Sequence, residues 1–389
     1  MLRRPKTMTL RSLVRPLHLS TLLFVAACGG STPAPADPSG GAAASATTAP
    51  EAGGSAAIPG LPARDPKLAE MIKAALACAK NDEFHSFDRE CAGFKAWDEA
   101  DELFAGGKAD DTLLSMWGDP DPNVRHLALP KRIKPAYWQD KGHAQALFAI
   151  ARAEKIRDYL SQLGTFAGQV DGEKVGLAAE QKDLAKHPSA DFRARFAAAL
   201  IPAAQTPLAL EIEQILIDDG EKDVRVYAVL GLAGEGVPAS DPVCKLLTKQ
   251  LARADDLHAN GIQAAAVSKC PGMRDQAAAE IDKRTADPTK VTFGAGMAYA
   301  SALFSLCYRA ESPEAKKKIF TLTRKLVDPK SLDRSIREKA LDELLSCDRP
   351  AGEKLLGTFA KDKDLAQHVK YLQDAINERK AADAKNKKK

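Results

Sequence analysis

The sequence predicts an all-α protein in which helix pairs stack into a solenoid after a disordered N-terminal tether. From Pro66 onward, apolar residues recur at spacings of three and four, and clusters of Gly, Pro or Asp interrupt them every ten to twenty residues. Alanine is abundant, aromatic residues make up only 6%, and few runs are rich in Val, Ile, Thr or Tyr, which favours helices over sheets. Similar segments also recur at multiples of about 35 residues, a period typical of solenoids.

The first 27 residues have the order of parts of a signal peptide. Five basic residues and no acid precede the apolar run PLHLSTLLFVAA, residues 16–27. A membrane-spanning helix needs about twenty apolar residues, so this run is too short to span. We expect residues 1–27 to be a signal peptide that is removed.

The end of this segment, Val25-Ala26-Ala27-Cys28, resembles the lipobox of bacterial lipoproteins. The resemblance implies cleavage between Ala27 and Cys28, a diacylglyceryl thioether on Cys28, and acylation of the new amino terminus. Two or three acyl chains, such as palmitate, anchor a protein stably. Gly29 in place of Asp favours the outer membrane, on its periplasmic side or at the surface. The alternative is an ordinary signal peptide with a coincidental cysteine.

A low-complexity segment follows the cysteine. All but four residues from 29 to 62 are Gly, Ala, Pro, Ser or Thr, a composition that cannot bury enough apolar surface to fold. We expect residues 28–63 to be a disordered linker that reaches roughly 30 Å from the anchor.

The periodic part of the chain predicts seventeen helices, most of them in pairs. Their ranges are 66–80, 87–105, 110–118, 122–134, 142–163, 172–186, 190–201, 207–218, 222–233, 241–253, 256–269, 273–285, 294–309, 313–327, 333–346, 351–361 and 364–382.

Four segments repeat one another: DPDPNVRHLAL from Asp119, DFRARFAAAL from Asp191, DVRVYAVLGL from Asp223 and SIREKALDEL from Ser335. Each places an apolar residue before an arginine. An Asp ahead of the segment can cap the helix, and small residues such as Ala228 and Ala340 permit close approach of neighbouring units. We expect the arginines to project at equivalent points and to pair with acids of the neighbouring turn. They are Arg125, Arg193, Arg225 and Arg337.

This pattern resembles the HEAT-repeat family, particularly its short phycobilisome-lyase-like form, whose second helix carries an Asp, a Val-Arg pair and an Ala. The resemblance implies an α-solenoid of about eight helix pairs over residues 64–380, followed by a basic disordered tail, 381–389. Residues 142–163 and 256–309 depart from the pattern. The alternative is an irregular helical bundle.

Six cysteines remain after Cys28, an even number that indicates disulfides in a protein that crosses the inner membrane. Six cysteines allow fifteen pairings, and free buried thiols or a metal site are alternatives. No CxxC occurs and no histidine falls at ligand spacing near a cysteine pair, so we expect no metal. The pairs we expect are Cys78 with Cys91, Cys244 with Cys270, and Cys307 with Cys347.

Charge and motifs exclude several functions. Without residues 1–27 the chain has 51 Lys and Arg against 52 Asp and Glu, and no basic stripe is visible, so nucleic acid is not an expected partner. No P-loop, HExxH or GxSxG occurs. His85, Asp88 and Cys91 share a helix face, but a disulfide is the better use of Cys91. We expect no catalytic residues and no cofactor.

The loop PKRIKPAYWQDKG, residues 130–142, is the best candidate for a binding surface because it combines basic residues with adjacent Tyr and Trp side chains. Alternatively, both rings cover a seam between two units. The candidates are Lys131, Arg132, Lys134, Tyr137 and Trp138.

Taken together, these patterns predict a lipid-anchored cell-envelope scaffold that binds a protein or peptide on stacked helices. The alternatives are an envelope enzyme or enzyme subunit of the lyase-like repeat type, a structural spacer, or a binder of cell-wall polymer.

Overall fold

A computed structural model describes residues 58–386, except 59, 81, 83–84, 105–106, 108, 205 and 234–236. These residues belong to a compact unit, 50–389. They form nineteen α-helices, two short 3-10 helices and no strand, which confirms the all-α prediction for this part of the chain. The expected signal peptide, Cys28 and the linker up to residue 57 lie outside the described residues.

The helices are α1 (Pro66–Leu76), α2 (Ala92–Asp98), α3 (Asp101–Phe104), α4 (Asp110–Trp117), α5 (Pro122–Ala128), α6 (Lys141–Ala153), α7 (Arg157–Gly168), α8 (Ala178–Leu184), α9 (Ala190–Ala204), α10 (Pro207–Ile217), α11 (Lys222–Gly231), α12 (Asp241–Leu251), α13 (His258–Val267), α14 (Met273–Arg284), α15 (Phe293–Tyr308), α16 (Pro313–Val327), α17 (Arg334–Cys347), α18 (Arg349–Phe359) and α19 (Ala366–Asn386), with 3-10 helices at Pro135–Gln139 and Pro288–Lys290.

Two of the predicted helices are each two helices in the structure. The range 87–105 divides into α2 and α3, and the range 142–163 divides into α6 and α7. In the second case Glu154 ends α6 and turns the chain. Its carboxylate accepts hydrogen bonds from the N–H groups of Lys155 at 2.7 Å and Ile156 at 2.8 Å. These local bonds compete with helix continuation, and period alone does not reveal them.

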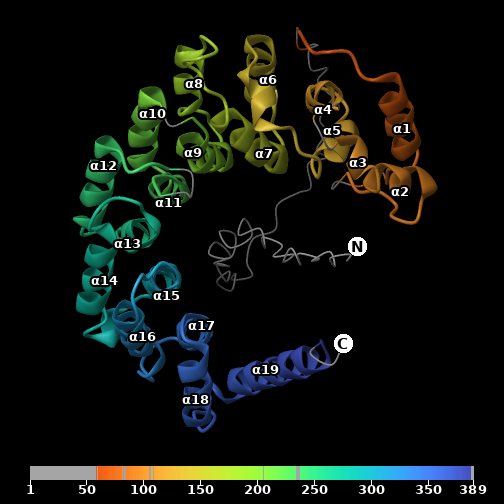
Figure 1. The fold of residues 1–389 in the computed structure, drawn as a ribbon. Helices are drawn as coiled ribbons and strands as arrows, with labels where there is room; N and C mark the ends of the chain where they lie inside the picture. The colour runs from red at the N-terminus through yellow and green to blue at the C-terminus, as the bar shows by residue number, and fades with distance from the viewer. Residues whose placement is uncertain are drawn as a thin grey trace, which may run out of the picture. The chain divides into compact units, whose positions relative to one another are not determined.

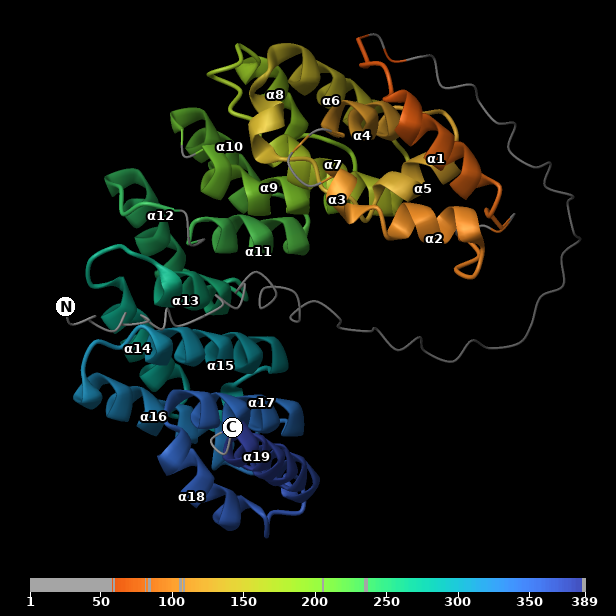
Figure 2. The ribbon, with the colours of Figure 1, turned by 45° about the vertical axis from the view of Figure 1, so that its right-hand side comes forward.

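The helices from α7 to α18 form two rows (Figures 1 and 2). In the first row α7, α9, α11, α13, α15 and α17 each pack on the next. The alternate helices α8, α10, α12, α14, α16 and α18 form the second row, on one side of the first. Within the described residues, α9, α11, α13 and α15 pack substantially only on neighbours in these two rows. The opposite side of these four helices, which we call the uncovered face, therefore has none of the described helices packed on it.

Small residues set the spacing of the first row. A Cβ added to Gly164 of α7 would lie 2.4 Å from the carbonyl oxygen of Phe192 in α9, a distance that no side chain can occupy. Ala228 and Ala340, which we expected at close contacts, are fully buried. Larger side chains at these positions would hold the helices apart.

Three disulfides form with the predicted partners. They are Cys78–Cys91, Cys244–Cys270 and Cys307–Cys347, with Cα–Cα distances of 5.8, 5.6 and 5.5 Å. The last joins the C-terminal ends of α15 and α17. Such bonds persist in oxidising compartments, so they indicate that the helical unit lies outside the cytoplasm.

At the C-terminal end α19 continues to Asn386, past the expected repeat boundary at residue 380, so the first part of the predicted basic tail is helical. Residues 387–389 lie outside the described residues. Among the described helices, none combines the length and the apolar content that crossing a membrane requires.

Candidate functional site

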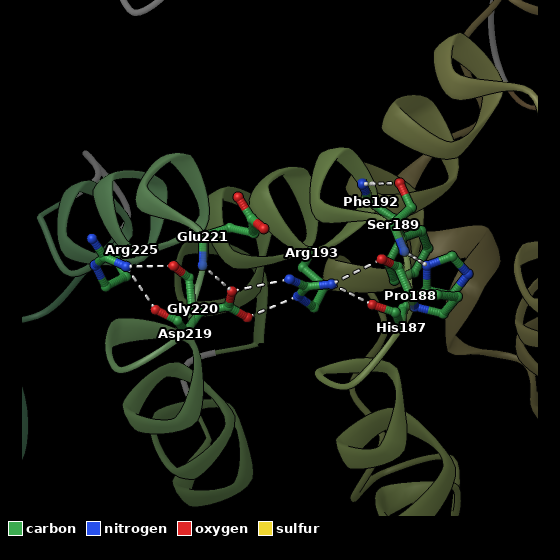
Figure 3. Close-up of polar contacts among 9 residues, drawn as sticks. All are labelled: His187, Pro188, Ser189, Phe192, Arg193, Asp219, Gly220, Glu221 and Arg225. Carbon is green, nitrogen blue, oxygen red and sulfur yellow. Dashed lines mark hydrogen bonds and ion pairs between the residues drawn. The ribbon is translucent and has the colours of Figure 1, made fainter.

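The arginine of the repeated segment fastens one helix pair to the next. Phe192, at the start of α9, is fully buried. The guanidinium of Arg193, the next residue, contacts two turns: the turn before α9 and the turn before α11 (Figure 3). Its Nη1 donates to the carbonyl oxygens of His187 at 2.5 Å and Pro188 at 3.3 Å. Its Nε and Nη2 donate to the two carboxylate oxygens of Asp219 at 2.8 and 3.0 Å. The guanidinium therefore holds its own helix start and the turn before α11.

Asp219 lies at the centre of this contact and serves two arginines. Its carboxylate also accepts the N–H of Glu221 at 2.8 Å, and its carbonyl oxygen accepts Nη1 of Arg225 at 2.8 Å (Figure 3). Burial alone would raise the pKa of the Asp219 carboxyl, but the hydrogen bonds from Arg193 and the Glu221 N–H hold that pKa below its ordinary value. The carboxylate is thus charged at neutral pH.

The same turn occurs a second time, before α5. The carboxylate of Asp119 accepts from Arg64 and from the N–H of Asp121, and its carbonyl oxygen accepts Nη1 of Arg125 at 2.5 Å. Arg125 also pairs with Glu154, Nε to Oε2, at 2.9 Å. Arg125 and Arg193 thus pair with acids of a neighbouring turn, as expected, whereas Nη1 of Arg225 bonds to the carbonyl oxygens of Asp219 and Gly220.

Arg337 follows a different geometry. It is fully buried in α17, where its Nε donates to the carbonyl oxygen of Val327 at 2.8 Å and its other nitrogens pair with Asp362 and Asp364. The structure also adds an arginine that the sequence analysis missed. Nε of Arg274 donates to the carbonyl oxygen six residues earlier, that of Ser268, at 3.2 Å.

A signal for Arg274 was present in the sequence. The buried Met273 before it makes the same apolar-Arg pair as the other segments, but its distance from them is not a multiple of the period. We refer to the contacts that these arginines make with the turns as the arginine ladder. Its members are Arg125, Arg193, Arg225, Arg274 and Arg337. Because its guanidinium groups form hydrogen bonds with main-chain and carboxylate oxygens of the turns, we assign the ladder a structural role and not a role in ligand binding.

The loop of residues 130–142 does not present the side chains expected of a binding surface. Trp138 is fully buried, with its ring centroid 5.2 Å from that of Phe166. Lys131 is also buried, with Nζ 2.7 Å from a carboxylate oxygen of Asp101. Trp138 and Lys131 therefore cover a seam between helices, which corrects their assignment as contact residues.

The other members of that loop remain at the surface. Arg132 and Lys134 are exposed, whereas Tyr137 is half-buried. The Tyr137 ring stacks on His143 at 3.9 Å between centroids, and its hydroxyl donates to Asp111 at 2.6 Å. Tyr137 is thus fixed by contacts with His143 and Asp111, so the side chains that the loop exposes to a partner are mainly those of Arg132 and Lys134.

The uncovered face is better placed to meet a partner. Near its start, Nε of Arg195 in α9 donates to Oγ of Ser161 in α7 at 3.2 Å, and its guanidinium carbon lies 5.0 Å from the ring centroid of Tyr227 in α11. Further along, α13 and α15 contain no Asp, Glu, Lys or Arg. Phe293 and Tyr308 of α15 are 53% and 68% exposed. An apolar, uncharged surface of this kind marks contact sites in soluble proteins.

Two buried ionisable groups, Glu213 and His258, lie outside the arginine ladder. Glu213 of α10 is fully buried, neither of its carboxylate oxygens has a hydrogen-bond partner, and this burial raises its pKa well above the ordinary value. His258 of α13 is also buried, which lowers its pKa, and its Nε2 lies 3.5 Å from Glu280. They lie on different helices, and the contacts of the described residues join neither to a Ser or Cys nucleophile.

Within the described residues, no three His, Cys, Asp or Glu side chains are grouped as metal ligands. No protein-family model matches the chain, and neither a curated protein nor a solved structure matches it significantly.

Proposed function

We propose that this protein is a lipid-anchored scaffold of the bacterial cell envelope that binds a protein or peptide partner on its helical unit. In this proposal the helical unit of residues 64–380 is an α-solenoid of about eight HEAT-like helix pairs, six of which form the two rows. The observation that carries partner binding is the uncovered face, where two consecutive first-row helices have no charged residue and two large rings are exposed.

The anchor is proposed from the lipobox-like Val25–Cys28, with Cys28 as the lipidated residue after removal of 1–27. The three disulfides support export, because the same bonds would be reduced in the cytoplasm. The outer membrane is the proposed location, on the strength of Gly29. In this arrangement the protein has two partners: the membrane, through the lipid on Cys28, and the protein or peptide bound by the helical unit.

The burial of the tryptophans weighs against one alternative. A binder of cell-wall polymer needs aromatic side chains along a groove, whereas the three tryptophans are each at most 1% exposed and the exposed rings of Phe293 and Tyr308 lie at opposite ends of one helix. A structural spacer needs no exposed apolar patch at all. The apolar part of the uncovered face therefore favours protein binding over both.

The test compares the wild type with Cys28→Ala in envelope preparations. For the wild type we expect partition into detergent, an N-terminus that begins at Cys28, and capture of a partner by crosslinking. Cys28→Ala is expected to lose the partition. A wild type that stays in the aqueous phase with residues 1–27 attached contradicts the anchor, and a wild type that captures no partner above background contradicts the scaffold.

A further inference from the structure

The exposed side of α15 carries a continuous stripe of uncharged side chains. Its members are spaced by four, four, three and four residues, so at 100° per residue they fall within about 80° of one helix face. The α15 stripe consists of Phe293, Met297, Ser301, Phe304 and Tyr308. Gly296 and Cys307, which face α17, are buried, as are the other residues on the packed sides of the helix. The stripe therefore lies on the uncovered face.

The stripe exposes more apolar area than any isolated surface residue. An aromatic side chain has about 200 Å² to bury, so Phe293 at 53% and Tyr308 at 68% leave roughly 240 Å² in contact with water. Phe304 stacks on Tyr308 with ring centroids 6.4 Å apart, and both Phe304 and Met297 are half-buried. The whole stripe thus exposes roughly 300–400 Å², within the size range of patches that function as interaction sites.

The helices on either side of the stripe present few unpaired charges. On one side α13 has no charged residue. On the other side the charges of α17 are paired, since Nζ of Lys339 lies 2.6 Å from Glu343 and Nε2 of His368 lies 2.8 Å from Asp342. A partner therefore gains nothing from a charge on the surface that meets α15, and a charge there would lose its hydration without compensation.

We infer that the α15 stripe is the docking site for one amphipathic α-helix of a partner protein, which rests on the proposed partner binding. The stripe runs along the 16 residues of α15, about 22 Å from first to last, which a partner helix of about four turns would cover. That helix would lie against α15 between α13 and α17, with uncharged apolar residues at spacings of three and four. The required chemistry is an uncharged apolar stripe on an otherwise polar helix.

A second copy of this chain fits the site less well. A stable dimer interface buries about 800 Å² on each partner, roughly twice what the stripe offers. An extended peptide is also a poor match, because strand addition needs an open sheet edge and the described residues contain no strand.

The experiment places a photo-crosslinking amino acid at Met297 of the full chain, with Tyr371 of α19 as the matched control because it is 67% exposed and lies outside the stripe. The protein is irradiated with detergent-solubilised envelope, and crosslinked residues are mapped by mass spectrometry. We expect position 297 to crosslink to a partner segment with apolar residues at spacings of three and four. That segment, synthesised as a peptide of about four turns, should bind the wild type and lose at least tenfold in affinity to Met297→Glu.

A combined Phe293→Ser and Tyr308→Ser variant should reduce the crosslink at least tenfold, whereas Tyr371→Ser should not. Unchanged circular dichroism is expected of each variant, and an unchanged melting temperature is expected of the Ser variants, because Phe293, Tyr308 and Tyr371 are largely exposed. Crosslinks to another copy of the chain, with concentration-dependent sedimentation, overturn the assignment of the occupant. Equal yields at Met297 and Tyr371, or crosslinks to an extended segment, overturn the site.

The two proposals fail differently. If the wild type captures a partner and the stripe variants capture it equally well, partner binding stands and the docking site is wrong. If the wild type captures nothing above background, the proposed function is wrong and the docking site falls with it.

Discussion

Removing the guanidinium of Arg193 should open the seam between α9 and α11. Its pair with Asp219 is two-pronged, and the two side chains are only 13% and 11% exposed. Breaking a fully buried pair costs about 3–5 kcal/mol, and the partial exposure here lowers the expected loss for Arg193→Ala to about 2–4 kcal/mol. Arg193→Lys should lose about half of that, because an ammonium cannot make both carboxylate bonds.

The assay is urea unfolding followed by circular dichroism, with Asp219→Ala and the double variant completing a cycle. We expect a coupling free energy of about 1–3 kcal/mol between Arg193 and Asp219. Lys222→Ala is the control, since its ion pair with Asp256 is more than half exposed and should contribute less than about 1 kcal/mol. A coupling no larger than the effect of that control would refute the ladder as a fastening between helix pairs.

The pH dependence of this effect has a definite sign. The pKa of Asp219 is lower in the folded protein than in the unfolded chain, where it is about 3.9. The stabilisation is therefore complete above that value and is lost as the pH falls through the lower, folded pKa. The stability difference between wild type and Arg193→Ala should be constant from pH 5 to 7 and should narrow below about pH 4.

Three other substitutions test the packing. Glu213→Met should raise the free energy of unfolding by about 1–3 kcal/mol at pH 8 and by less at pH 5. The reason is that burial raises the pKa of the Glu213 carboxyl, so this group destabilises the fold increasingly as the pH rises above about 4.5. Equal gains at both pH values contradict this explanation. Replacing Cys307 and Cys347 together by Ala should cost about 2–5 kcal/mol, measured by thermal melting, and reductant should then change the melting less than in the wild type. Gly164→Ala should cost about 1–3 kcal/mol because its Cβ meets the main chain of α9, whereas Gly294→Ala, which has open space, should be neutral or stabilising; similar urea midpoints for the two would refute the close-approach explanation.

Helix positions followed from the sequence more closely than their interruptions did. The expected ranges 207–218 and 313–327 match α10 and α16 to within a residue, because strong apolar periodicity and an N-cap with proline fix both ends. The break between α6 and α7 did not follow, because it involves hydrogen bonds from the N–H groups of Lys155 and Ile156 to the Glu154 carboxylate, which Arg125 of a distant helix also contacts. Periodicity describes one helix at a time and carries no information on such a contact.

The sequence predicted most of the arginines that belong to the ladder, but it did not predict all of their hydrogen-bond partners. The apolar-Arg pair identified Arg193 and Arg225, and the spacing of Asp219 six residues before Arg225 repeats that of Asp119 before Arg125. What the sequence could not show is that one aspartate would serve the arginines of two helix pairs.

The binding surface was misplaced for a related reason. Composition drew attention to Trp138, yet a large ring next to basic residues is as useful under a seam as on a surface, and here it is buried. The α15 stripe went unnoticed because an uncharged helix can equally be buried on all sides. Only the arrangement of the second row shows which side of α15 stays open.

The disulfide between Cys307 and Cys347 has a mechanical consequence. It closes a loop of 40 residues that includes α16 and most of α17. When the chain is pulled from its two ends, this loop bears no load and cannot lengthen, so roughly 140 Å of potential extension is withheld. Under tension the segment between α15 and α18 would behave as a short, inextensible link, and only reduction would release its hidden length.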